Sequence, residues 1–114
     1  MSNFDLEERT TNFAKAVIRL CKGLPRNPIN NRLIDQVVGA SGSVGANYIE
    51  ANEALSKKDF LMRIRISLKE VKETVYWLKL ILYNNLDLSS DIDKLVLESV
   101  EVKKILGAIL KNSQ

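Results

Sequence analysis

The helix expected over 57–83 constrains this chain more than any other part of the sequence. Seven apolar residues recur in it with the spacing 3, 4, 3, 4, 3, 4: Leu61, Ile64, Leu68, Val71, Val75, Leu78 and Leu82. No Gly or Pro interrupts the segment, and the spacing places all seven residues on one side of a helix of about seven turns. A long helix with one apolar side needs other helices to cover that side, so the pattern predicts a helical bundle.

A second series in the same segment keeps this spacing with one position skipped, and we expect its members to share another face: Lys58, Arg65, Lys69, Lys72, Tyr76, Lys79 and Tyr83. The segment 57–83 holds seven Lys or Arg against three Asp or Glu, whereas 28–55 holds one against three. The net charge of the chain is only +3. The basic character is therefore concentrated on one helix, whose exposed face is a candidate for anion binding.

Two helices should precede this one. The first is expected over 6–23, because Gly23 followed by Pro25 is a typical helix stop. The second is expected over 28–54, because Asn27 suits an N-cap and Pro28 suits the first helical position. Its buried side should consist of the apolar residues Leu33, Ile34, Val37, Val44, Tyr48, Ile49 and Leu55.

The middle of the second helix consists almost entirely of small residues, with Gly39, Gly42 and Gly45 at intervals of three. Each Gly inside a helix costs about 0.8–1 kcal/mol relative to Ala. Either the helix breaks here, or the small residues allow another helix to approach closely. Helical periodicity resumes on both sides without a Pro, which favours close packing.

Turn signals on either side of the central helix complete the organisation. Ser56 with Asp59 resembles a capping box before it, and Ser90 with Asp91 and Asp93 predicts an N-cap for a fourth helix over 90–111. Four helices joined by short connections predict an all-α, antiparallel up-down-up-down four-helix bundle that forms a single domain over 1–114.

The composition excludes several kinds of catalysis. The chain has no His, so Ser-His-Asp and Cys-His mechanisms are impossible. The single Cys21 lies on an apolar side and is expected in the core. The pairs Glu50 with Glu53 and Glu70 with Glu73 have the spacing of bundle metal ligands but lack the histidines of such sites. We interpret them as solvated charges or as partners of Lys69 and Lys72, and an all-carboxylate site for a hard cation is the alternative. We expect no enzymatic activity, cofactor or metal.

The cellular location is inferred from what the chain lacks. Residues 1–6 do not have the pattern of a secretory signal, and the apolar runs are too short to span a membrane. A single cysteine cannot form an internal disulfide and fits a reducing compartment. We therefore expect a cytoplasmic protein.

Two interpretations of the basic face remain open. Its cations can neutralise phosphates and its tyrosines can stack on unpaired bases, which makes the candidate nucleic-acid-binding residues Lys58, Arg65, Lys69, Lys72, Tyr76 and Lys79. The alternative is an ordinary solvated face. Further apolar residues widen the apolar surface beyond one bundle core and predict contact between subunits: Ile66, Trp77, Leu80 and Ile81.

Several motifs together resemble a known family. They are the opening Phe4-Asp5-Leu6-Glu7-Glu8-Arg9-Thr10, then Leu33-Ile34-Asp35-Gln36, Ser43-Val44-Gly45-Ala46-Asn47-Tyr48-Ile49-Glu50-Ala51, Ser56-Lys57-Lys58-Asp59-Phe60, Lys69-Glu70 through Glu73, and Tyr76-Trp77-Leu78. Over about residues 4–83 the chain is similar to the bacterial four helix bundle protein family, which is related to proteins encoded in intervening sequences of large-subunit rRNA genes. The fourth helix carries none of these motifs.

The resemblance implies an up-down bundle that assembles as a homopentamer. It also implies a relation to the accessory protein of diversity-generating retroelements, which binds nucleic acid and a reverse transcriptase. Gly39 departs from the family pattern, which commonly has a basic residue there, and this removes one charge that would reach a phosphate. We therefore expect a homo-oligomeric nucleic-acid-binding or RNP accessory protein, with a structural adaptor that binds another protein as the alternative.

Overall fold

The computed structural model describes residues 3–114, with side chains from residue 5 onward, and Met1 and Ser2 lie outside this range. Its long helices are α1 (Asn3–Lys22), α2 (Pro28–Asn52), α3 (Lys57–Asn84) and α4 (Ser89–Ser113), and a single 3-10 turn, η1 (Leu86–Leu88), precedes α4. Each long helix packs against its neighbours in the chain, and α1 also contacts α4. This is the up-down-up-down four-helix bundle that the sequence predicts.

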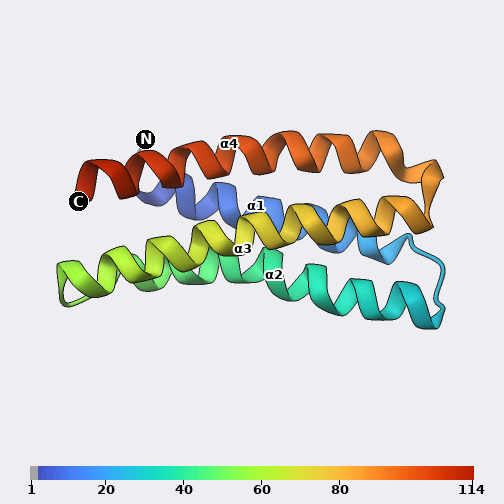
Figure 1. Ribbon diagram of the computed structural model, residues 1–114, viewed down its shortest axis with the longest axis horizontal. Coiled ribbons are helices and arrows are strands. Elements are labelled where there is room, and N and C mark those ends of the chain that lie inside the picture. The colour runs from blue at the N-terminus through green and yellow to red at the C-terminus, as the bar shows by residue number, and fades with distance from the viewer. Residues whose placement is uncertain (1–2) are drawn as a thin grey trace.

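The bundle is elongated, with extents of 44 × 23 × 19 Å. The start of α1 and the end of α4 lie at one end of the bundle together with the α2–α3 connection, and the other two connections lie at the opposite end (Figure 1). Within residues 3–114, no helix is both long enough and apolar enough to cross a membrane.

The N-terminal caps explain where two of the helices begin. The Asn27 side chain accepts a hydrogen bond from the backbone N–H of Asn30 at 2.8 Å, and Ser56 accepts one from the N–H of Asp59 at 3.1 Å. Both predicted caps are confirmed. The prediction for Ser90 was wrong, because α4 begins at Ser89 and continues directly from η1 without a side-chain cap.

The buried core consists of two apolar clusters that follow one another along the bundle. The first lies toward the α3–α4 connection and contains Phe13, Val17, Leu20, Cys21, Leu24, Val37, Leu78, Ile81, Ile92 and Leu95. The second lies toward the termini and contains Leu6, Val44, Tyr48, Ala51, Ile64, Val71, Val102 and Leu106. Cys21 is a core residue as expected, and burial raises the pKa of its thiol. Ile49 and Leu55 were predicted to be buried and are instead 38% and 101% exposed, because Ile49 points outward and Leu55 lies in the α2–α3 connection.

A layer of buried hydroxyl groups separates the two clusters. Each helix contributes one such residue, located between a member of the first cluster and a member of the second: Thr10, Ser41, Thr74 and Ser99. All four donate to backbone carbonyls of their own helices, at 2.8 to 3.3 Å. These small side chains satisfy their polar groups locally, so they occupy the core without requiring partners on other helices.

The small-residue segment of α2 is helical throughout, so the predicted absence of a break is confirmed. Close packing is found at Gly45, where an added Cβ would lie 2.9 Å from Thr10 Oγ1 on α1. At Gly39 and Gly42 an added Cβ would have nothing within 4 Å. The close-packing prediction was therefore correct for Gly45 and wrong for Gly42 within one subunit, because Gly45 is buried against α1 whereas Gly42 is exposed.

A cluster of asparagines holds α2 and α3 together at one end of the bundle. The side-chain amides of Asn30 and Asn85 are buried and bond to each other in both directions, at 2.9 and 3.2 Å. Asn30 also donates to the Pro25 carbonyl, and Asn85 donates to the Ile81 carbonyl, at 2.8 and 2.9 Å. The Asn30 oxygen accepts a further hydrogen bond from Asn84. This network joins the α1–α2 connection to the C-terminal end of α3.

Candidate functional site

The seven residues of the predicted basic and aromatic face are all exposed on α3. Tyr76 is 56% and Tyr83 is 84% exposed. The opposite side of the helix is buried. Its buried residues are Ile64, Ser67, Val71, Thr74, Leu78 and Ile81. The apolar series that we identified in the sequence is only partly the same, because the core also accepts Ser67 and Thr74.

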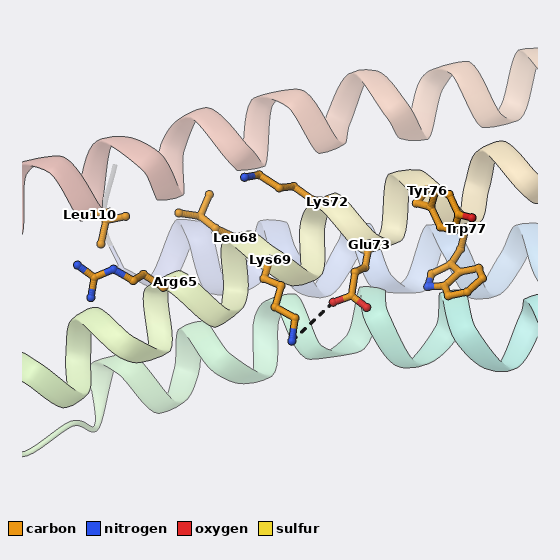
Figure 2. Close-up of a pocket in the computed structure, with 8 residues that line it drawn as sticks. All are labelled: Arg65, Leu68, Lys69, Lys72, Glu73, Tyr76, Trp77 and Leu110. Atoms are coloured by element: carbon orange, nitrogen blue, oxygen red, sulfur yellow. Dashed lines mark ion pairs between the residues drawn. The ribbon is translucent and has the colours of Figure 1, made fainter.

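Part of the exposed face forms an open depression with a volume of about 740 Å³. Its lining comes from α3 and the C-terminal part of α4: Arg65, Leu68, Lys69, Lys72, Glu73, Tyr76, Trp77 and Leu110. Figure 2 shows Leu68 and Leu110 facing the space between the two helices, with the Arg65 side chain at one end and Tyr76 and Trp77 at the other. We call this depression the α3–α4 groove.

The structure brings four of the predicted binding residues, Arg65, Lys69, Lys72 and Tyr76, into the groove. Lys58 and Lys79 are exposed on the same helix but do not line it. Sequence reasoning missed Leu110, because nothing in the α3 pattern indicates which residue of α4 will lie opposite.

Few of these cations are neutralised within the chain. Lys69 Nζ lies 3.9 Å from Glu73 Oε2, one helical turn away. Among residues 3–114, no acidic group lies within ion-pair distance of Arg65, Lys72 or Lys79. The groove therefore presents unpaired positive charge to solvent at Arg65 and Lys72.

The aromatic end of the groove is held by a ring contact. Tyr76 and Trp77 meet edge to face, with ring centroids 5.2 Å apart and an angle of 68° between the planes. Trp77 is partly buried and packs against the first core cluster. The core thus supports Trp77, and Trp77 in turn supports the exposed ring of Tyr76.

Two neighbouring carboxyl groups, Glu70 and Glu73, lie on the side of α3 that faces α2, and Glu73 also lines the groove. Burial raises the pKa of Glu70, the adjacent Glu73 carboxyl raises it further, and Lys69 and Ser43 oppose the shift. Glu73 Oε2 is a buried atom without a hydrogen-bond partner. Glu50 and Glu53 are exposed elsewhere on or just after α2. Across residues 3–114, no three potential metal-ligating side chains of Asp, Glu, Cys or His come together.

The predicted contact surface between subunits needs one correction. Ile66, Trp77 and Leu80 are partly exposed, but Ile81 is fully buried in the first core cluster. Ile81 therefore has no surface to offer a second subunit, and the prediction for this residue was wrong. Met62, which is 45% exposed on α3, is a further apolar surface residue that sequence reasoning missed.

One ion pair outside the groove joins the first and last helices. Arg9 on α1 donates two hydrogen bonds of 2.8 Å, from Nε and Nη2, to the two carboxylate oxygens of Glu98 on α4. The two residues are 89 positions apart in the chain. Sequence patterns carry no signal for this pair, because each residue alone looks like an ordinary surface charge.

Comparisons with known proteins agree with the fold and the motifs. Residues 2–108 match the family model described as "23S rRNA-intervening sequence protein". The structure is similar to that of a protein of unknown function from the S23 ribosomal protein family of Bacteroides thetaiotaomicron VPI-5482. The two share 30% sequence identity, with a TM-score of 0.85 over 97% of this chain and 99% of that chain. Comparison with curated proteins gave no match. The chain belongs to the 23S rRNA-intervening sequence protein family.

Proposed function

We propose that this chain is a non-enzymatic, homo-oligomeric accessory protein that binds nucleic acid, as part of an RNP, through the exposed face of α3. The observation that carries the proposal is the unpaired charge of Arg65 and Lys72 beside the exposed ring of Tyr76. Cations of this kind release counterions when they contact phosphates, which gives salt-dependent affinity. The family description, which refers to 23S rRNA, is consistent with a nucleic-acid ligand.

The proposal also includes assembly of several copies. Ile66, Trp77 and Leu80 are only partly covered within one subunit, and the family resemblance favours a pentamer. A ring repeats the basic face in every subunit, so several modest patches can bind one polyanion together. This matters because a single patch with two unpaired groove cations binds weakly.

Light scattering tests the assembly. We expect a mass near five times 12.9 kDa. A monomer at micromolar concentration would contradict oligomerisation altogether. A dimer would contradict the pentamer but would still be consistent with contact between subunits through the partly exposed apolar residues.

A double charge reversal tests binding. Arg65→Glu with Lys72→Glu should weaken binding to RNA at about 50 mM salt at least about tenfold and reduce the salt dependence, because fewer phosphates are neutralised. The matched control is Lys15→Glu with Lys22→Glu on α1, which changes the net charge by the same amount at exposed positions outside the groove. Far-ultraviolet circular dichroism checks that both variants fold.

The alternative function is a structural adaptor for another protein. Undiminished RNA binding by the Arg65→Glu, Lys72→Glu variant, or no RNA binding by the unaltered chain, would favour this alternative. The proposed site on α3 would then be rejected, whereas the four-helix fold and the family assignment would be unaffected.

A further inference from the structure

We infer that the α3–α4 groove binds unpaired bases, so that the ligand of this face is a single strand rather than a duplex. This inference rests on the proposed function and specifies its ligand class. The observation behind it is the combination of an apolar floor, an exposed aromatic ring and unpaired cations in one groove.

The floor of the groove is apolar. Leu68 on α3 and Leu110 on α4 are both partly exposed and face the space between the helices (Figure 2). A second depression of about 200 Å³ continues between the same helices and shares Lys72 with the first. Its apolar lining residues are Val71, Val75, Val96 and Val100. A charged phosphate makes no favourable contact with such an apolar floor, whereas the flat face of an unpaired base can pack against it.

Cations lie along the rim of this apolar surface. Arg65 and Lys72 line the larger depression, and Lys72 and Lys103 line the smaller one. None of the three has an ion-pair partner among residues 3–114. The separation of Arg65 and Lys72 corresponds to a rise of about 10 Å along the helix. This rim fits a backbone of phosphates that runs beside the groove while its bases turn inward.

Tyr76 supplies the stacking surface. More than half of this residue is exposed, and its orientation is constrained by the edge-to-face contact with Trp77. Because Trp77 packs against the core, the tyrosine ring is held in place before a ligand binds. Stacking on such a ring tolerates any base, since every base has a π face.

A duplex cannot use these features together. Its bases are already stacked and paired, so it presents mainly phosphates and groove edges to a protein. Bound to this face, a duplex would contact Arg65 and Lys72 and leave Leu68, Leu110 and the Tyr76 ring in water. The groove therefore discriminates in favour of unpaired strands.

The test compares three probes of about 16 nucleotides at about 50 mM salt: a single-stranded RNA, its duplex, and an abasic strand with the same number of phosphates. Trp77 is the only tryptophan, so its fluorescence reports directly on the groove. We expect the single strand to bind about tenfold more tightly than either other probe and to quench Trp77 fluorescence.

Tyr76→Leu removes the ring and preserves apolar bulk and charge. This variant should bind the single strand only as tightly as the abasic strand, with an unchanged salt dependence. The matched control is Tyr83→Leu, which removes an exposed tyrosine of the same helix outside the groove and should leave the preference intact.

The outcomes separate the inference from the proposed function. Equal binding of all three probes, or an equal loss of abasic and single-strand binding in Tyr76→Leu, would refute base recognition while leaving nucleic-acid binding in place. No binding of any probe would refute both and favour a protein as the occupant of the groove.

Discussion

The hairpin formed by α2 and α3 has an inner face, which packs into the bundle, and an outer face, which is turned toward solvent. On the inner face, buried polar groups form hydrogen bonds within the subunit. Ser67 donates to the Val44 carbonyl at 2.7 Å, and Asn30 and Asn85 bond to each other. The outer face differs. It carries Glu73 Oε2, the single buried side-chain nitrogen or oxygen within residues 5–114 that has no hydrogen-bond partner, although Lys69 Nζ lies 3.9 Å from it. It also carries unpaired cations and two glycines, Gly39 and Gly42, where an added Cβ would meet nothing within 4 Å.

This difference separates the residues that maintain the fold from those available for binding. A buried polar group without a partner costs about 1–3 kcal/mol, so substitutions on the inner face should lower stability. Groups on the outer face have few contacts to lose, so their substitutions should leave stability nearly unchanged or raise it. The following predictions test this comparison, beginning with the largest expected effect.

Asn30→Ala should be the most damaging change. It removes one partner of the buried Asn85 amide and the side-chain donor to the Pro25 carbonyl, and we expect a loss of about 3 kcal/mol in the free energy of unfolding. Urea denaturation measures the loss. Asn31→Ala, at the exposed neighbouring position on α2, is the matched control and should change stability little. Equal losses in both variants would show that the asparagine network contributes nothing specific.

Gly45→Leu should overpack the contact with Thr10 on α1 and cost on the order of 1–3 kcal/mol. The reason is the 2.9 Å separation that even a single added Cβ would have from Thr10 Oγ1. Gly42→Leu provides the control, because an added Cβ there has open space around it. Thermal unfolding measures the melting temperatures of the two variants. An unchanged melting temperature for Gly45→Leu would contradict the close-packing interpretation.

Gly42→Ala should raise stability by up to about 1 kcal/mol, because Ala is the better helix former and this position is open. The same substitution also probes the oligomer. If the mass from light scattering falls while the helix content rises, Gly42 lies in a contact between subunits. A lower melting temperature without a change in mass would show that the outer face is packed within the subunit after all.

Glu70→Gln should have the smallest effect, and that effect should depend on pH. Burial raises the pKa of Glu70 from its ordinary value of 4.5, so the ionised carboxylate destabilises the fold at pH 7. Its cost disappears as the pH falls through the raised pKa to 4.5 and below, where the group is protonated in both the folded and the unfolded state.

The variant should therefore unfold at a higher temperature than the unaltered chain at pH 7 and at the same temperature near pH 4. Glu50→Gln on the exposed side of α2 serves as the control. A stabilisation by Glu70→Gln that persists unchanged at pH 4 would show that it does not arise from the charge of this carboxyl group.

The order of effects distinguishes the two faces. If Asn30→Ala and Gly45→Leu are costly and the outer substitutions are neutral or stabilising, the partnered groups of the inner face maintain the fold. If the charge reversal of Arg65 and Lys72 also lowers stability, the outer face is not a free surface and the assignment of the groove has to be revised.

Much of the architecture was predictable because helix periodicity and caps are local properties. The apolar spacing of α3 identified a long helix, and Asn27 and Ser56 marked the starts of α2 and α3. The start of α4 was predicted less well, because η1 passes directly into the helix and no side chain caps its first turn.

The candidate site was predictable on one helix only. The spacing of Arg65, Lys69, Lys72 and Tyr76 placed them on one exposed face of α3, which the structure confirms. Leu110 and the apolar floor required knowledge of how α4 lies against α3. Conversely, Ile81 looked like surplus apolar surface in the sequence and is part of the core.

The sequence by itself determined the helices, their order and the concentration of positive charge on α3, since these follow from residues within a few turns of one another. Only the tertiary structure decided which groups become partners across the bundle, such as Arg9 with Glu98 and Asn30 with Asn85, separated by 89 and 55 positions. It also decided that Gly45 is crowded and Gly42 is open. The physical reason is that periodicity determines the face of a helix on which a residue lies, whereas burial and pairing depend on the distant segment that packs against that face.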